Sequence, residues 1–543
     1  MNLPILSLTL FSPLAGALML VLTPGQEIAG VRRSALVYSL IPFGFSLLLL
    51  AWFDSADPGF QFVERAAWIP GFHIDYHLGV DGMSLFLVLL TTFLTPVVVL
   101  ASWGDIEARV KEYMVLLLFL ETGMLGAFLA LDLFLFYVFW EVMLVPMYFI
   151  IGVWGGPRRI YAAIKFVLFT MVGSLPMLVA ILYLVWLYAQ QHGQVSFNLL
   201  QLYELNVPLA TQLWLFAAFA LAFAIKVPLF PFHTWLPDAH VEAPTGGSVI
   251  LAGVLLKLGT YGFLRYAVGL FPQAAAVAWP FVAGAAVIGI VYGALVSMVQ
   301  PDLKKLVAYS SVSHLGFVML GLFAFNQQGV TGSIYQMLNH GLSTGALFLV
   351  VGVIYHRRHT RLIADFGGLW KQLPLFSVVF LVVMLSSVGL PGLNGFVGEF
   401  LILLGAFDSS VTAAVIGTMG IILGAVYMLW MFQRVMFGPL DKPANQALSD
   451  LTGRELVVFA PVLLMIVVMG VYPRPFLSRM EPSVQAYVAR IERKLASAPS
   501  EPTGHDPSRV EVAAAPAADG GEVGTRSAAP ARGVVPISRS QQP

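Results

Sequence analysis

The stretch TQLWLFAAFALAFAIKVPLFP, residues 211–231, is apolar over most of its length but carries Lys226 near its end. A helix of roughly 20 apolar residues crosses the hydrocarbon core of a bilayer. Pro228 and Pro231 follow the lysine closely, and proline removes a backbone donor and clashes with the preceding turn. The stretch therefore predicts a membrane helix that is broken beside a buried cation.

Similar apolar stretches recur along the whole chain. Of the 543 residues, 58% are hydrophobic and 11% are charged, whereas a soluble domain carries roughly 25% charged residues. We therefore expect an all-α integral membrane protein rather than a soluble enzyme. It has about 14 predicted transmembrane helices, which are 3–23, 34–52, 79–102, 113–130, 133–152, 163–188, 211–231, 246–270, 277–299, 306–324, 331–355, 373–404, 411–436 and 455–473.

The composition also excludes several kinds of chemistry. The chain has no cysteine, so it has no disulfide, no thiolate-held iron–sulfur cluster and no cysteine nucleophile. It has no G-x-G-x-x-G opening a βαβ unit and no Walker A sequence, and its zero net charge gives no sign of nucleic-acid binding. We expect no cofactor and no metal on this chain, so that any linked redox chemistry belongs to partner chains.

Basic residues favour one side of the predicted bundle. The connections from odd- to even-numbered helices hold fifteen Lys and Arg, and the other connections hold two, Arg65 and Arg265. Basic loops face the cytoplasm, so both termini are predicted on the opposite side. Arg474 and Arg479, after the last helix, run against this pattern. The first span lacks the basic start of a cleaved signal, and nothing resembles a transit peptide, which favours a bacterial inner (plasma) membrane.

Several ionisable residues fall in the middle of predicted helices. A charge there costs about 2.5–3.5 kcal/mol on insertion scales, so such residues need a reason. Structural salt bridges would explain the buried acids and bases, but they would not explain the two histidines among them. We therefore favour a proton or ion relay. Lys165 fits either a side chain that reaches the surface or a role in the site. Lys304, Lys305 and Lys371 are expected to be interfacial anchors or orientation signals. The predicted relay residues are Glu121, Glu141, Lys226, Lys257, His314, His340 and Glu399.

A second helix also looks broken. In SSVGLPGLNGFVGEF, residues 386–400, Pro391 lies among three glycines and Glu399 follows. Irregular backbone at this depth is tolerated only inside protein or beside a wet cavity, although ordinary proline kinks are the alternative. The two breaks lie five helices apart, which predicts two inverted five-helix repeats, helices 4–8 and 9–13. The expected divisions are 1–112, 113–270, 277–436, 437–496 with the last span and a polar flank, and a disordered tail at 497–543.

A carboxylate that moves toward or away from a buried lysine changes the proton affinity of that lysine. Glu141 and Lys226 are therefore the pair expected to load and release a proton.

Four segments carry a resemblance to a known family. They are FYVFWEVMLVPMYFIIGVWGG at 136–156, KVPLFPFHTWLPDAHVEAPTGGSVILAGVLLKLGTYG at 226–262, PDLKKLVAYSSVSHLGFVMLG at 301–321 and MLNHGLSTGALFLVVG at 337–352. They resemble the antiporter-like, proton-conducting membrane subunits of NADH–quinone oxidoreductase (respiratory complex I), which are related to multisubunit cation/proton antiporters. The resemblance covers all of the chain except its tail.

The resemblance implies fourteen helices, with Glu141 and Lys226 as the functional pair and Lys257, His314 and His340 as the lateral connection to an exit-side Glu399. Glu121 matches a further carboxylate of the family's fourth helix. Sister subunits of L and N type carry Lys in the broken twelfth helix, whereas this chain has Glu399. The implied partners are neighbouring L- and N-type subunits and small membrane subunits, with NADH, FMN, iron–sulfur clusters and quinone on or between partners. The rival readings are a subunit of a Na⁺/H⁺ antiporter complex and a purely structural membrane scaffold.

Overall fold

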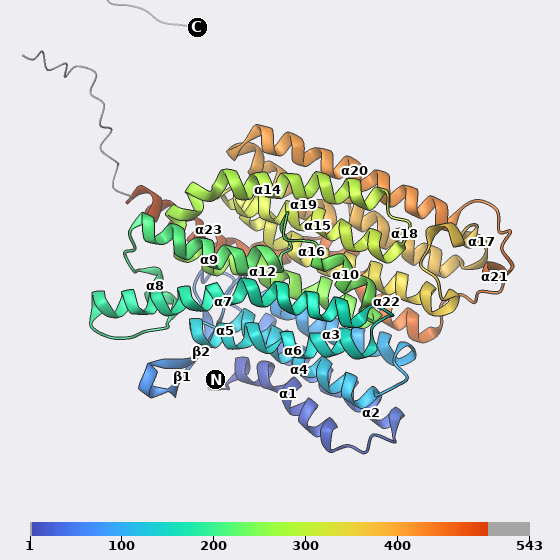
Figure 1. Ribbon diagram of the computed structural model, residues 1–543, viewed down its shortest axis with the longest axis horizontal. Helices are drawn as coiled ribbons and strands as arrows, with labels where there is room; N and C mark the ends of the chain where they lie inside the picture. The colour runs from blue at the N-terminus through green and yellow to red at the C-terminus, as the bar shows by residue number, and fades with distance from the viewer. Residues whose placement is uncertain (1–2, 498–543) are drawn as a thin grey trace, which may run out of the picture. The chain divides into compact units, whose positions relative to one another are not determined.

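The computed structural model describes residues 3–497 and forms a bundle of long helices (Figure 1). Within these residues, 13 segments are long and apolar enough to cross a membrane. They are α1 Ile5–Leu22, α2 Ile28–Trp52, α3 Leu85–Asp105, α4 Val110–Leu129, α5 with α6 Leu133–Trp154, α7 Arg159–His192, α9 Leu209–Lys226, α11 to α13 Thr245–Leu270, α14 Pro272–Met298, α15 Leu303–Leu322, α16 Gln327–Arg358, α20 Val411–Met436 and α22 Gly453–Val471.

The predicted twelfth span, 373–404, is a broken helix. Its halves are α18 Pro374–Val388 and α19 Asn394–Ser409. Gly389 ends the first half with φ of +80° and Gly392 has φ of +95°, a left-handed conformation that glycine adopts without a steric penalty. The predicted break around Pro391 is confirmed. The predicted all-α membrane architecture is also confirmed, since the 13 apolar segments and this broken helix together match the predicted spans.

The other predicted break is also present, but its limits differ from those expected. Helix α9 ends at Lys226, and a second short helix, α10 Trp235–Glu242, follows an irregular stretch. The Trp235 indole N–H donates to the carbonyl of Ile225 at 2.8 Å, so a side chain satisfies part of the freed backbone. The predicted span 211–231 was therefore wrong at its end, because the helix stops at the lysine and resumes beyond the prolines.

Two further irregularities were not predicted. The fifth span is divided into α5 Leu133–Val142 and α6 Leu144–Trp154. Pro146 explains this division, because a proline ring clashes with the carbonyl four residues earlier, which is that of Val142. The eighth span contains two π-helical turns, Leu251–Leu255 and Phe263–Ala267, which flank α12 Leu256–Gly262.

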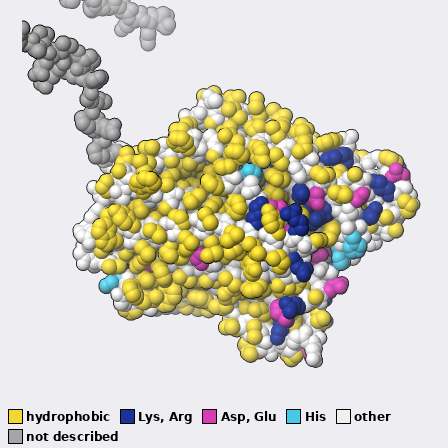
Figure 2. Space-filling model, viewed as in Figure 1, with side chains coloured by type: hydrophobic (Ala, Val, Ile, Leu, Met, Phe, Trp, Pro, Cys, Tyr) yellow, Lys and Arg dark blue, Asp and Glu magenta, His cyan; other side chains and the backbone are white. Residues whose placement is uncertain are grey.

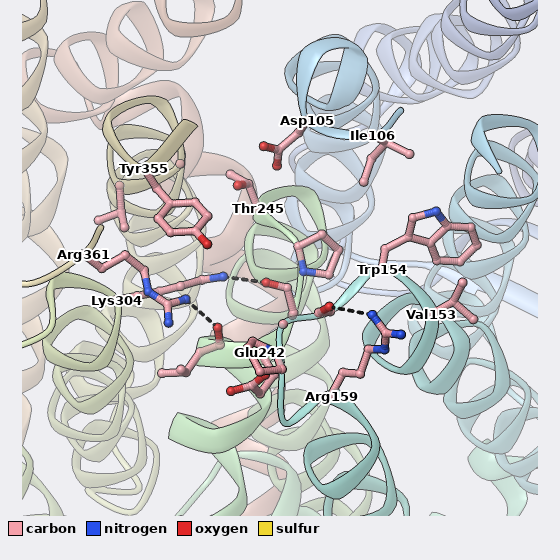
Figure 3. Close-up of a pocket in the computed structure, with 18 of the residues that line it drawn as sticks. Asp105, Ile106, Val153, Trp154, Arg159, Glu242, Thr245, Lys304, Tyr355 and Arg361 are labelled. Carbon is pink, nitrogen blue, oxygen red and sulfur yellow. Dashed lines mark hydrogen bonds between the residues drawn. The ribbon is translucent and has the colours of Figure 1, made fainter. Parts of the chain in front are cut away.

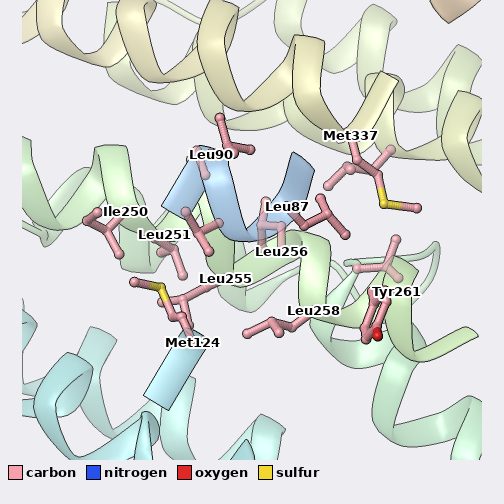
Figure 4. Packing of buried hydrophobic residues seen from close by; sticks show 14 of the residues in the cluster. Leu87, Leu90, Met124, Ile250, Leu251, Leu255, Leu256, Leu258, Tyr261 and Met337 are labelled. Atoms are coloured by element: carbon pink, nitrogen blue, oxygen red, sulfur yellow. The ribbon is translucent and has the colours of Figure 1, made fainter. Parts of the chain in front are cut away.

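The eighth span lies at the centre of the bundle. Its most apolar 18-residue window is completely buried, and leucines on all sides of it pack against α3, α4 and α16 (Figure 4). Helices that are apolar all round are buried in this way. A charged residue on this span therefore faces protein and not lipid.

Extramembrane elements cap the bundle (Figure 1). An antiparallel hairpin, β1 Gln61–Ile69 and β2 Ile74–Val80, was not predicted. The predicted polar flank is helix α23 Arg474–Ala496, which buries one stripe of side chains, including Met480, Val484 and Ile491. The remaining short elements are η1 Pro70–Phe72, α8 Leu199–Tyr203, η4 Ile363–Asp365, α17 Leu369–Gln372 and α21 Pro443–Gln446.

The surface agrees with a membrane protein. Apolar side chains cover most of the face shown in Figure 2, and charged side chains gather toward the end where α17 and α21 lie. The predicted tail at 497–543 lies outside the described residues except for Ser497. The division into inverted repeats remains a prediction.

Candidate functional site

Lys257 is held inside the bundle by the unusual helix that carries it. Its side chain is completely buried. The ammonium donates to the carbonyl of Ala252, in the preceding π-helical turn, and lies 2.7 Å from Nδ1 of His340 on α16. A π turn disturbs the regular α-helical hydrogen-bond pattern and is frequent at functional sites, and here it presents a carbonyl to the lysine.

Two histidines continue from Lys257 toward α19. The rings of His340 and His314 have centroids 5.9 Å apart. Nδ1 of His314, on α15, lies 3.1 Å from the Glu399 carboxylate on α19. Lys257, His340, His314 and Glu399 thus form a buried row, which we call the Lys257–Glu399 row, with polar contacts at its two ends and ring packing between its two histidines.

Neutral amides and a small cavity border the end of this row. The Gln336 amide donates to the Glu399 carboxylate at 3.0 Å, and Asn339 donates to Gln336 at 3.0 Å. The cavity has a volume of about 10 Å³ and is lined by both histidines of the row and by Glu399, a size close to that of one water. Nε2 of each histidine has no protein hydrogen-bond partner. A water there would give both rings a second hydrogen bond.

Lys226 and Glu141 form a separate group, whose charged atoms lack hydrogen-bond partners in the described part of the chain. Lys226 is the last residue of α9, is 1% exposed, and makes no hydrogen bond through its ammonium. The ammonium instead faces the rings of Trp140 and Phe166, 5.2 and 5.5 Å from their centroids, an arrangement that favours a cation. Oε1 of Glu141, beside the division between α5 and α6, is buried without a partner. Within the described residues no ion pair joins the two.

Glu121 stands apart from both groups. It lies on α4 with no exposed surface, and neither carboxylate oxygen has a hydrogen-bond partner. The structure therefore joins four of the seven predicted relay residues in one row, and leaves Glu121, Glu141 and Lys226 without hydrogen bonds to that row.

The lysines outside this set behave differently from one another. Lys165 pairs with Asp238 of α10 at 2.7 Å, and Lys305 and Lys371 are exposed. Lys304 was expected at the interface but is 6% exposed, and its ammonium donates to the carbonyl of Ala243 at 2.5 Å. Lys304 is therefore not an exposed anchor, because its side chain packs against the end of α10, and its role as an orientation signal remains a prediction.

Lys304 lines a polar pocket of about 390 Å³ on the side of the basic loops (Figure 3). Arg361 also lines it and donates to the carbonyl of Val241 at 2.7 Å. Asp105 and Glu242 bring carboxylates to the same pocket. The pocket reaches the last turn of α10, where Val241 and Glu242 line it.

Sequence reasoning missed two buried ionisable features. His240 on α10 has no exposed surface, stacks on Phe348 with centroids 4.5 Å apart, and has no hydrogen bond at either ring nitrogen. Its residue range was not assigned to a helix, so its depth was not noticed. Arg265 pairs with Asp81 at 2.6 Å, with side chains 3% and 4% exposed. It was counted only as a helix-end charge.

Comparison with known proteins identifies the family. The profile of the NADH:quinone oxidoreductase/Mrp antiporter transmembrane family matches residues 130–435, and that of the NADH-ubiquinone oxidoreductase chain 4 amino terminus matches residues 59–127. The chain is 48% identical over 503 residues to NADH-quinone oxidoreductase subunit M of Rhodobacter capsulatus, covering 90% of this chain and 98% of the relative. The chain belongs to the NADH-quinone oxidoreductase subunit M family. It is also 47% identical over 484 residues to NADH-ubiquinone oxidoreductase chain 4 of Arabidopsis thaliana, covering 89% and 97% of the two chains.

Solved structures agree with membership of the subunit M family. A chain of respiratory complex I from Thermus thermophilus superposes with a TM-score of 0.82 at 34% identity, covering 90% of this chain and 99% of that one. A chain of the Mrp complex from Dietzia sp. DQ12-45-1b has a TM-score of 0.76 at 21% identity, covering 90% of this chain and 100% of that one, and shows the fold alone. The predicted function, an antiporter-like proton-translocating membrane subunit of complex I, is confirmed, and the antiporter alternative is less supported.

Proposed function

We propose that the Lys257–Glu399 row carries protons through this subunit, and that Glu141 and Lys226 load it. The observation that supports this most directly is the alignment of the four side chains across α12, α16, α15 and α19, with contacts of 2.7 and 3.1 Å at the ends and a cavity of about 10 Å³ beside the two histidines. A proton can pass between groups joined by hydrogen bonds or by one water. Glu399 is the exit-side group in this proposal.

Glu141 and Lys226 act as the switch. The ammonium of Lys226 has aromatic neighbours but no counter-ion within hydrogen-bond reach. A small shift of Glu141 at the division between α5 and α6 therefore changes the electrostatic environment of the lysine, and with it the proton affinity. Glu121 is a further proton-holding group of the relay, since a buried carboxylate without partners is stable when protonated.

The energy comes from partner chains. Moving one charge against 100 mV costs about 2.3 kcal/mol, so proton translocation needs a source of energy. We propose that no redox centre, cofactor or metal lies on this chain to supply it. The chain has no cysteine, and residues 3–497 contain no cluster of three His, Asp or Glu suited to a metal. NADH, FMN, iron–sulfur clusters and quinone belong on or between partners, among them L- and N-type neighbours and small membrane subunits.

The membrane setting is proposed from the loop charges. The chain lies in the bacterial inner membrane with the polar pocket of Lys304 and Arg361 toward the cytoplasm and both termini on the other side. Helices 4–8 and 9–13, residues 113–270 and 277–436, are the two inverted repeats. The breaks after Lys226 and before Glu399 then occupy corresponding places in each repeat.

The test is proton pumping by the reconstituted complex, with electron transfer measured in parallel. Glu141→Gln and Lys226→Met should abolish pumping through this subunit while the complex still assembles. Glu112→Gln and Lys305→Met, which change exposed residues, are the matched controls and should pump normally. Full pumping by Lys226→Met would exclude the proposed switch, and full pumping by both site variants would favour a structural scaffold.

A further inference from the structure

The ammonium of Lys226 lacks the partners that a buried charge normally has. The side chain is 1% exposed, and among residues 3–497 no hydrogen bond or ion pair reaches its Nζ. A buried ammonium is strongly destabilising unless other groups compensate its charge. The charged form of this lysine therefore needs a different source of stabilisation.

Two aromatic rings lie where such partners would be. Nζ of Lys226 is 5.2 Å from the ring centroid of Trp140 on α5 and 5.5 Å from that of Phe166 on α7. The face of an aromatic ring attracts a cation within about 6 Å, most strongly when the ring is an indole and the site excludes water. The rings of Trp140 and Phe166, which we call the aromatic cage, are therefore placed to stabilise the ammonium.

The aromatic cage is fixed by its own surroundings. Trp140 and Phe166 are at most 1% exposed. Trp140 packs on Phe223 of α9, with ring centroids 5.4 Å apart, and Phe166 packs on Trp235 of α10 at the same distance. The indole N–H of Trp235 donates to the carbonyl of Ile225, the residue before the lysine. The cage is thus joined to the end of the helix that carries the ammonium, which keeps the rings and the charge in register.

Trp140 is also the neighbour of Glu141 in the sequence, close to the end of α5 at Val142. Consecutive side chains of an α-helix point about 100° apart and do not share a face. While the indole lies over the ammonium, Oε1 of Glu141 is buried and has no hydrogen-bond partner in residues 3–497. A rotation of this last turn, beside the division between α5 and α6, would exchange the indole for the carboxylate. Lys226 thus has two alternative partners on one turn of one helix.

We propose that the aromatic cage binds the ammonium of Lys226 while Glu141 is turned away, so that the lysine stays charged between the two positions of the carboxylate. Trp140 and Phe166 act through the lysine and carry no proton themselves. Their part in pumping rests on the proposed function, whereas the contact between the cage and the ammonium does not. The alternative is that the rings only fill space around the aliphatic part of the lysine.

The first experiment measures the contact by thermal dissociation of the subunit from the purified complex. Tryptophans with increasing numbers of fluorine atoms, incorporated in place of Trp140, nearly keep the shape of the indole but withdraw negative charge from its face. With Lys226 present, the dissociation temperature should fall with each added fluorine, relative to the same series in Lys226→Met. That variant keeps the length of the side chain without its charge, so the difference between the two series isolates the contact.

The second experiment measures proton pumping along the same series in reconstituted vesicles, with electron transfer in parallel. Pumping per electron should fall step by step, by about five-fold for the most fluorinated indole, because a weaker contact leaves the lysine charged for less of the time. Trp140→Tyr should retain more pumping than Trp140→Leu, because only the first keeps an aromatic face.

The control places the same fluorinated residues at Trp186. This side chain is 51% exposed on α7, and no cation of the described residues lies over its ring. Pumping should be unchanged by fluorination there.

Two results would overturn the proposal. Equal changes in dissociation temperature with Lys226 and with Lys226→Met would show that the rings only fill space. Pumping that does not depend on the number of fluorine atoms would exclude the cage from the relay. Because thermal dissociation does not depend on pumping, the cage can fail while Lys226→Met still abolishes pumping, and it can hold even if Lys226→Met pumps normally.

Discussion

Removing either member of the buried pair Asp81–Arg265 should destabilise the subunit, but by different amounts. Breaking a buried ion pair from one side costs about 3–5 kcal/mol, because it leaves an uncompensated charge. After Arg265→Met, the Asp81 carboxylate still accepts the backbone N–H groups of Met83 and Ser84, both at 3.1 Å. We therefore expect a cost of about 3 kcal/mol.

Asp81→Ala should cost more. Among residues 3–497, the guanidinium of Arg265 would retain the hydroxyl of Tyr261, 3.1 Å from Nε, and the ring of Phe60, with its centroid 4.8 Å from Cζ. The backbone donors at the start of α3 would also lose their acceptor, which adds about 1 kcal/mol. We expect a total cost of about 5 kcal/mol.

The assay is thermal dissociation of the subunit from the purified complex, with both single variants and the double variant Asp81→Ala/Arg265→Met. The double variant should be more stable than the sum of the single effects predicts, because neither charge is then left alone. Additive losses, or a larger loss for Arg265→Met than for Asp81→Ala, would refute the reasoning.

Three other outcomes are expected. His340→Ala interrupts the row and should reduce pumping at least ten-fold relative to electron transfer in reconstituted vesicles, whereas His359→Ala, at an exposed position, should have no effect; equal pumping would contradict the role of the row. Gly259→Ala places a methyl 2.6 Å from a backbone nitrogen at the break after α9 and should lower both pumping and thermal stability. Gly284→Ala meets nothing within 4 Å, so a similar loss there would show that the effect is not local. Burial first, and then the nearby Arg65 cation, lower the pKa of His77 from 6.5 to about 4, so this histidine favours folding above pH 6.5 and less so as the pH falls toward 4; His77→Gln should reduce the loss of thermal stability between pH 6.5 and 5, and an unchanged pH dependence would exclude this cause.

Apolar length and proline position were sufficient to predict most of the membrane fold. The glycines around Pro391 indicated the break before Glu399, because a left-handed backbone at Gly389 and Gly392 requires that residue type. The signal for the division of the fifth span was present in Pro146 but was read as part of a continuous helix. Spans of 20 apolar residues do not reveal α10, which is too short to be found by length.

Depth along the helices predicted the buried charges but not their connections. Counting residues placed Lys257 and His340 near the same level, and they are in contact. The same counting grouped Lys226 with Lys257, although the direction of each side chain depends on how its helix packs. The hairpin and α23 were missed because hydropathy alone does not distinguish a packed amphipathic surface element from a loop.

The π-helical turn before Lys257 gives this helix one more residue per turn than an α-helix has. One residue corresponds to about 100° of rotation about the helix axis. Deleting a single amino acid within Leu251–Leu255 would therefore rotate the side chain of Lys257 away from the imidazole of His340. The depth of Lys257 in the bundle would stay almost the same. In homologous chains, an insertion or deletion at this point would change the direction of this lysine side chain, and with it the course of the proton path, even if every titratable residue were kept.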